Sequence, residues 1–347
     1  MFEISYTLRL VLLGTLMLGV SAGMLGTFLV LRSQALMGDA LSHSALPGVM
    51  LAYIISGVRD LQVLLIGAFL SALLATALLE MIKRYTTIKF DASMALILAG
   101  FFGFGQVLLS HIQTGGAASQ AGLSTFVLGQ AATMLRADIV MIAWMSAIVL
   151  FVIALFYKEL KLFVFDGQYF KVIMRHERII SVVLNAMVVF VIVIGIRMVG
   201  VILMSALLIA PGVAARQLSN RLWLNLVYAG IVGGVSGIIG AFLSARISGM
   251  PTGPAIAVVL GVIVIIALLF SPKKGLVRHF VFLRRFRRSI HTYKPLIHMY
   301  EKQSPLAFDH AQAERFCAQG LIQSRGTQWS LTHKGETLVR RIMGEWT

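Results

Sequence analysis

Asp39 and His43 are the two residues whose type and spacing best suit chemistry, and they lie in the run GDALSHSALPG (residues 38–48). They are four residues apart, so in a helix both side chains lie on one face. A carboxylate oxygen and a neutral imidazole nitrogen are the ligands expected for a first-row divalent metal such as manganese, iron or zinc. Ionisable groups in hydrocarbon each cost about 3 kcal/mol or more, so those retained usually face a protein interior or a water-filled path.

The same pair has a structural alternative. Asp39 follows Gly38 where a helix could begin, so an Asp39–His43 ion pair that caps the helix explains these residues equally well. Two ligands also leave a metal site incomplete, because structural metal sites usually have four. Two copies that face each other across a symmetric dimer would supply two carboxylates and two imidazoles. The residues alone leave both interpretations open.

Four other residues bear on a metal-binding role. Ser42 could donate a hydrogen bond to a metal ligand. Pro47 and Gly48 follow within two turns and are expected to bend or loosen the helix, which lets it line a cavity. His111 lies at the outer end of a later apolar segment, where it could meet incoming metal, although a single interfacial histidine is more often structural.

Composition identifies an integral membrane protein. Of 347 residues, 58% are hydrophobic and 13% are charged, whereas soluble domains carry about a quarter charged residues. A helix that crosses a bilayer needs about 20 predominantly apolar residues. Candidate segments lie at 8–31, 40–56, 61–82, 91–110, 137–157, 179–196, 198–215, 223–247 and 251–270. Nine crossings are expected if 179–215 forms two helices, and eight if it forms one broken helix.

The charge distribution predicts the orientation of the chain. The net charge is +16, and residues 273–347 hold 14 Lys and Arg against 5 Asp and Glu. Basic residues also gather in alternate linkers, which the positive-inside rule places in the cytoplasm together with the C-terminus. A basic tail beside a membrane favours contact with anionic lipid, and charge alone is weak support for nucleic acid as a partner.

The C-terminal residues form a different kind of sequence. A helix start at Ser304–Pro305, a C-terminal cap at Gly320, two short strands within 321–332 and a final helix predict a helix–hairpin–helix unit. This order resembles a winged-helix module, which could regulate, dock a partner or simply stabilise the cytoplasmic face. The expected division is a transmembrane domain (1–275), a basic cytoplasmic linker (276–303) and a small winged-helix-like cytoplasmic domain (304–347).

The run GDALSHSALPGV resembles the D-x-x-S-H-x-x-x-P-G signature of the membrane subunits of ABC-type manganese, zinc and iron uptake systems. Residues 124–138, 197–221 and 248–272 are similar to later segments of that family, in the same order. The resemblance implies an all-α membrane protein with the vitamin B12/metal-type ABC importer permease fold and about eight or nine transmembrane helices. It places the family's metal-handling pair on Asp39 and His43.

The resemblance also implies partners. A permease of this kind carries the metal as transported substrate and holds no permanent cofactor. Cytoplasmic ATP-binding subunits, an extracytoplasmic metal-binding protein and a second permease, identical or paralogous, would complete the system in the cytoplasmic (inner) membrane of a bacterium. The chain lacks the phosphate-binding motif G-x-x-x-x-G-K-[ST], so it is not expected to be an enzyme, and ATP hydrolysis is expected in a separate subunit.

The linker 157–178 contains the expected ATPase-docking element. Apolar and basic residues are interleaved there, which suits a docking surface, although a loop lying against lipid headgroups explains the pattern as well. The family's segment runs F-D-x-x-F-A with a following Gly, whereas Phe170 stands here where the small residue is expected. The docking residues implied by the resemblance are Phe165, Asp166, Tyr169, Phe170 and Lys171.

Two other functions compete with an ABC permease. A secondary carrier could use Asp39 as a proton or sodium relay, and it would transport without any ATPase. A membrane-anchored winged-helix sensor would instead depend on residues 304–347 for its function.

Overall fold

The computed structural model divides the chain into two units, Met1–Lys273 and Lys274–Thr347. It describes residues 6–57, 60–114, 135–167, 169–170, 177–247, 249–271, 275–278, 280, 284, 293–300, 310–325 and 328–344. Each unit has a hydrophobic core of its own. The prediction divides the second unit further, into a linker (276–303) and a C-terminal domain (304–347), and that division stays a prediction.

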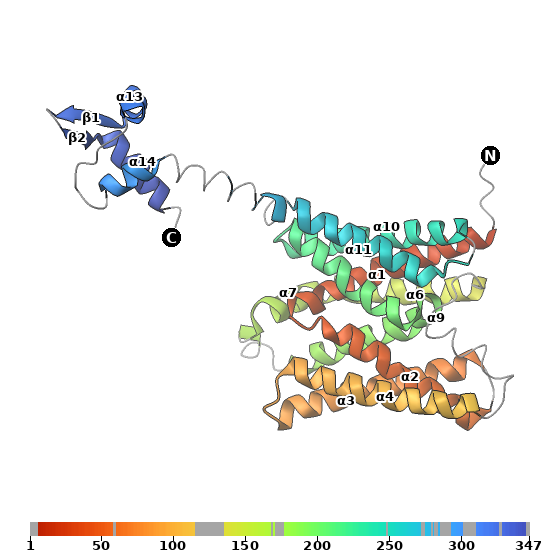
Figure 1. Ribbon diagram of the computed structural model, residues 1–347. Coiled ribbons are helices and arrows are strands. Elements are labelled where there is room, and N and C mark those ends of the chain that lie inside the picture. The colour runs from red at the N-terminus through yellow and green to blue at the C-terminus, as the bar shows by residue number, and fades with distance from the viewer. Residues whose placement is uncertain are drawn as a thin grey trace. The chain divides into compact units, whose positions relative to one another are not determined.

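The first unit is a bundle of helices. They are α1 (Tyr6–Leu31), α2 (Leu36–Ser56), α3 (Leu61–Tyr85), α4 (Phe90–Thr114), α6 (Arg136–Leu155), α7 (Tyr157–Phe165), α9 (Glu177–Leu218), α10 (Leu222–Arg246) and α11 (Thr252–Phe270). Figure 1 shows the long helices running side by side, with the short α7 at one end of the bundle. Helices satisfy their backbone hydrogen bonds internally, as a chain surrounded by lipid requires. The predicted all-α membrane architecture is confirmed.

Eight stretches of the described chain are long and apolar enough to cross a membrane. They are α1, α3 from Gln62, α4, α6, the parts 179–196 and 199–218 of α9, α10 and α11. Helix α2 is not among them, because Asp39, Ser42 and His43 reduce its hydropathy. Its 21 residues still give a length of about 31 Å, which is enough to span the hydrocarbon core. The expectation of eight or nine transmembrane helices is therefore confirmed.

Helix α9 consists of two helices that meet at Gly200. This residue has φ 83° and ψ 167°, a backbone conformation that favours glycine. The side chain of Met204 lies against Gly195, whereas a straight helix would separate these residues by about 13 Å. The chain therefore folds back near Gly200, and the second half packs along α1 with Leu208 against Gly26. Residues 179–215 thus form two helices rather than one.

Glycines allow the long helices to approach each other closely. A Cβ on Gly233 of α10 would overlap the backbone of Gly19 in α1, and a Cβ on Gly48 of α2 would overlap that of Gly67 in α3. Membrane helices associate largely through such close van der Waals packing, because lipid is as apolar as a leucine side chain. Gly48 therefore packs α2 tightly against α3. The expectation that it bends or loosens the helix stays a prediction.

The second unit is built around a small hairpin. Its elements are α13 (His310–Ala318), β1 (Ile322–Arg325), β2 (Gln328–Leu331) and α14 (His333–Gly344). The two strands pair antiparallel, with Ile322 opposite Leu331. Gly320 has φ 68°, and the Leu321 N–H donates to the Phe316 carbonyl, so the predicted C-terminal cap is confirmed.

The folded part of the tail begins earlier than residue 304. Residues 293–300 are helical, and Leu296 is fully buried in the core of this unit beside Phe316 and Val339. The predicted helix start at Ser304–Pro305 lies outside the described residues. The helix–hairpin–helix order is present, and the winged-helix identity stays a prediction.

The close contact between α1 and α10 predicts that adding a methyl group at Gly233 lowers the stability of the protein. We expect Gly233→Ala to lower the stability of the purified protein by about 1–3 kcal/mol, because its Cβ meets the Gly19 backbone, which cannot rotate away. Gly261→Ala in α11 is the matched control: no atom lies within 4 Å of its Cβ, and alanine is the better helix former. Thermal melting in detergent measures both variants. Equal melting temperatures would contradict the packing argument.

Candidate metal site

The local structure of α2 places Asp39 inside the helix rather than at its cap. The helix begins at Leu36, and its N-cap residue is Ala35, whose side chain makes no capping hydrogen bond. Asp39 is therefore the fourth helical residue. Its Oδ1 lies 3.4 Å from Nε2 of His43, one turn further along the helix. The pair forms as the spacing predicts, and the capping interpretation is not supported.

Two other helices contribute to the surroundings of the pair. The hydroxyl of Ser205, in the second half of α9, lies beside the Asp39 carboxylate, to which it can donate a hydrogen bond. The ring of Phe102 from α4 packs edge-on against the His43 imidazole, with a centroid separation of 4.8 Å and an interplanar angle of 78°. Such edge-to-face contacts favour one orientation of both rings. Three separate helices thus fix the positions of the carboxylate and the imidazole.

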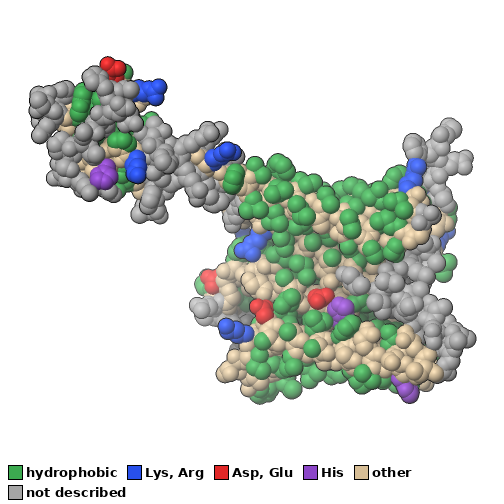
Figure 2. Space-filling view, in the orientation of Figure 1, with side chains coloured by type: hydrophobic (Ala, Val, Ile, Leu, Met, Phe, Trp, Pro, Cys, Tyr) green, Lys and Arg blue, Asp and Glu red, His purple; other side chains and the backbone are tan. Residues whose placement is uncertain are grey.

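The pair is accessible from outside the chain. The Asp39 side chain is 35% exposed and that of His43 is 19% exposed. Figure 2 shows many hydrophobic side chains on the visible face of the first unit, whereas acidic and histidine side chains are few there. An accessible carboxylate and imidazole on such a surface can meet a cation or a second protein.

One chain supplies only part of a metal coordination shell. Within the described residues, no group of three or more His, Cys, Asp and Glu side chains could hold a metal ion. Asp39 and His43 therefore form an open O/N pair rather than a closed structural site. This donor set suits divalent manganese, iron and zinc.

Two other candidate residues of α2, Ser42 and Pro47, have other roles. The Ser42 hydroxyl donates to the Gly38 carbonyl at 2.6 Å, so it can accept but not donate a hydrogen bond at the metal pair. Pro47 lies inside α2 and lines a cavity of about 380 Å³ between α2, α3 and α4.

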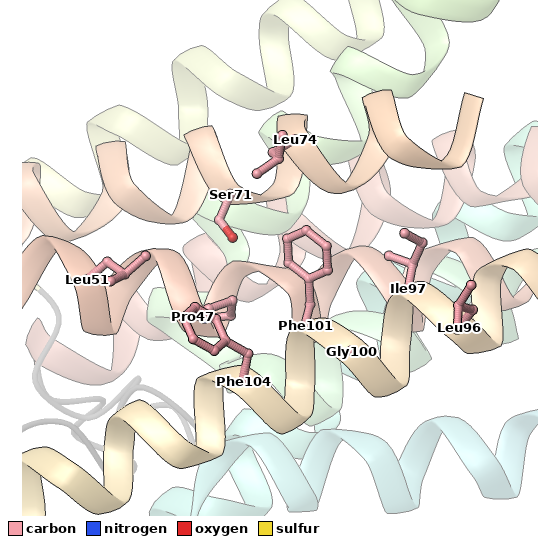
Figure 3. Close-up of a pocket in the computed structure, with 9 residues that line it drawn as sticks. All are labelled: Pro47, Leu51, Ser71, Leu74, Leu96, Ile97, Gly100, Phe101 and Phe104. Carbon is pink, nitrogen blue, oxygen red and sulfur yellow. The ribbon is translucent and has the colours of Figure 1, made fainter. Parts of the chain in front are cut away.

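Apolar side chains dominate this cavity. Figure 3 shows residues from the three helices converging on it. The lining residues are Pro47, Leu51, Ser71, Leu74, Leu96, Ile97, Gly100, Phe101 and Phe104. The Ser71 hydroxyl donates to the Ser44 carbonyl at 2.6 Å, so it is already used within the protein. The cavity therefore offers a cation little beyond hydrocarbon.

The expected docking element forms a short helical turn after α7. Oδ1 of Asp166 accepts a hydrogen bond from the Tyr169 N–H, and the Asp166 carbonyl accepts one from Phe170 N–H, both at 2.9 Å. Phe165 and Tyr169 are 57% and 53% exposed, whereas Phe170 is fully buried. Phe170 therefore faces inward and cannot belong to an outward docking surface. Lys171 lies outside the described residues.

The remaining candidate, His111, lies in the last turn of α4 and is exposed. Its carbonyl accepts a hydrogen bond from the Thr114 hydroxyl at 2.9 Å. Its suggested role in meeting incoming metal stays a prediction.

Sequence reasoning did not identify Ser205 or Phe102. Ser205 is a single polar residue in the apolar run GVILMSALLIAP, and that isolation is the one signal available. Phe102 lies among several phenylalanines of α4 and carries no such signal.

Known proteins are similar to this chain in sequence and in fold. Residues 4–271 match the model of the ABC 3 transport family. The chain is 43% identical over 270 residues to the zinc transport system membrane protein TroC of Treponema pallidum (strain Nichols), covering 78% of this chain and 91% of TroC. It is 42% identical over 292 residues to the manganese transport system membrane protein MntC of Bacillus subtilis (strain 168), covering 84% and 67%.

A solved structure has a similar fold. PsaBC from Streptococcus pneumoniae in complex with Fab superposes with a TM-score of 0.68 at 27% identity, over 79% of this chain and 95% of that chain. The helical bundle and these matches define the class as a membrane permease of a metal ABC transporter. The chain belongs to the ABC 3 transport family. Membership favours an ABC permease over the secondary carrier and the anchored sensor.

Proposed function

We propose that this chain is the permease subunit of an ATP-driven importer and that manganese, iron or zinc passes Asp39 and His43 on its way across the membrane. The zinc and manganese transport proteins to which the chain is similar support this substrate class. The observation that carries the site is the 3.4 Å separation of Asp39 Oδ1 and His43 Nε2. Ligand atoms about 2.0–2.2 Å from one ion stand about 3.3–3.6 Å apart at the tetrahedral angle. The two atoms therefore have the spacing of ligands that share one ion.

A second permease copy would complete the coordination shell. Two facing copies of Asp39 and His43 supply four ligands, and the accessibility of both side chains leaves room for such a partner. The transported ion then lies between the two chains, where a change in their packing opens or closes its shell. A site divided in this way can release its ion, which a transport site must do.

The remaining partners follow from the same proposal. Cytoplasmic ATP-binding subunits dock at the turn that exposes Phe165 and Tyr169. An extracytoplasmic metal-binding protein delivers the ion from the opposite side. The basic tail then lies in the cytoplasm, as the positive-inside rule predicts for a bacterial inner-membrane protein.

Removing either ligand tests the site. We expect Asp39→Asn and His43→Gln to lower metal accumulation in cells about tenfold or more, because each change removes a ligand while nearly keeping the side-chain size. Manganese, zinc and iron are measured side by side, at matched membrane levels of each variant.

Asp60→Asn is the control for the loss of a carboxylate. Asp60 is the N-cap of α3 and accepts from the Gln62 N–H at 3.0 Å, and asparagine caps equally well. Normal accumulation of all three metals in both Asp39→Asn and His43→Gln cells would show that the site assignment is wrong.

Loss of the Ser205 hydroxyl should impair transport less than loss of Asp39 or His43. Ser205→Ala removes the hydroxyl that lies beside the Asp39 carboxylate, and a hydrogen bond to a charged group is worth about 1.5–3 kcal/mol when buried. Since Asp39 is 35% exposed, water replaces part of that interaction, and we expect the apparent KM for metal to rise by about tenfold at most. Ser44→Ala is the control, because its hydroxyl bonds the Leu41 carbonyl. An unchanged KM in Ser205→Ala would exclude this role.

The exposed aromatic residues of the docking turn predict a loss of assembly. We expect Phe165→Ala and Tyr169→Ala to reduce co-purification of the ATP-binding subunits, since exposed aromatic side chains typically anchor protein interfaces. Trp144→Ala removes an equally exposed aromatic residue from the transmembrane part of α6 and should leave assembly unchanged. If all three variants assemble alike, the docking surface lies elsewhere.

A further inference from the structure

Phe170 is an expected docking residue that the structure buries completely, and its environment is specific. Its ring is fully buried and packs on the ring of Phe163, with centroids 5.3 Å apart. The backbone of the docking turn is held by Asp166, which accepts hydrogen bonds from the N–H groups of Tyr169 and Phe170. Tyr169 points outward from the same turn. The turn therefore has an outer face for a partner and an inner aromatic anchor.

Phe163 also contacts the loop that precedes the metal pair. The guanidinium carbon of Arg32 lies 4.0 Å from the centroid of the Phe163 ring, which is a cation–π contact. Arg32 is the first residue after α1. The side chains of Arg32, Phe163 and Phe170, which we call the aromatic stack, form a continuous contact from the docking turn to the α1–α2 turn.

The α1–α2 turn is short and hydrogen-bonded. The N–H groups of Arg32, Ser33 and Gln34 donate to carbonyls of the last turns of α1 at 3.1, 3.1 and 2.8 Å. Ser33 has φ 56°, so these bonds close α1 in the Schellman pattern, with serine in the place usually taken by glycine. Helix α2 begins two residues after Gln34, and Asp39 is its fourth residue. A displacement of Arg32 therefore reaches the first turn of α2 without a flexible linker.

We propose that Arg32, Phe163 and Phe170 are positioning residues that transmit movement of the docking turn to the Asp39–His43 pair. This inference rests on the proposed function, because it requires a partner that moves the docking turn. When that turn shifts, the buried Phe170 ring displaces Phe163, and Phe163 carries Arg32 with it. The hydrogen-bonded α1–α2 turn then changes the tilt of the first turn of α2.

Coupling between ATP hydrolysis and transport tests the proposal. The full complex with its ATP-binding subunits is reconstituted in proteoliposomes carrying Arg32→Gln, Phe170→Leu or both changes. Both metal uptake and phosphate release are measured. Leucine keeps position 170 apolar and able to be buried, but it removes the ring contact with Phe163. We expect each variant to assemble and hydrolyse ATP at the unmodified rate while metal uptake per ATP falls about fivefold or more.

Two comparisons make the test specific. Arg246→Gln removes a similar cation–π contact, 5.1 Å from the Phe242 ring at the end of α10, and should leave uptake per ATP unchanged. Uptake per ATP in the double variant should be no lower than in the more impaired of the two single variants, because both changes break the same connection. Unchanged uptake per ATP in Arg32→Gln and Phe170→Leu, or losses that add in the double variant, would overturn the proposal.

The metal pair is tested separately from its connection to the docking turn. If Asp39→Asn retains full uptake, the proposed metal site fails, whereas the ratio of uptake to hydrolysis in the stack variants still reports on coupling. If Asp39→Asn loses uptake and the stack variants keep a normal ratio, the metal site stands and the proposed connection fails.

Discussion

The structure depends on one constraint: polar groups within hydrocarbon must be enclosed by protein. Helix α2 carries Asp39, Ser42 and His43, so on hydropathy alone it is the least suited of the long helices to lipid. It is accommodated in part because α3, α4 and α9 pack around it, and this packing leaves Asp39 35% exposed and His43 19% exposed. The contact of Gly48 with Gly67 brings α3 within backbone distance and seals one side of α2 against lipid.

Much of this architecture follows from the sequence, because apolar length predicts a membrane helix almost directly. The start of α2 shows the limit of that method. The apolar segment begins at residue 40, whereas the helix begins at Leu36, since hydropathy does not measure helicity and polar residues can occupy a helix that other helices cover. The hairpin at Gly200 does not follow from the sequence, for a similar reason. A glycine permits a reversal but does not require one, and the packing of Met204 on Gly195 decides the outcome.

The site was partly predictable for the same physical reasons. Asp39 and His43 lie on one helix, so their spacing alone brings them together. Ser205 and Phe102 come from helices far along the chain, and tertiary packing alone places them beside the pair. Phe170 is intermediate: its departure from the family pattern is visible in the sequence, but its burial depends on Phe163, which no motif marks.

The position of the pair also explains how movement can change the proposed ion site. Helices α2, α3 and α4 contact one another, whereas α1, α10, α11 and α9 form a second group around the glycine contacts of α1, and Figure 1 shows the two groups as neighbouring layers. The neighbouring side chains of Asp39 and Ser205 lie on either side of the boundary between them. Relative movement of the two groups therefore changes the surroundings of the carboxylate. The short α1–α2 turn joins the groups on the N-terminal side of Asp39, so a force applied at Arg32 acts on this boundary rather than on the packed interior of either layer.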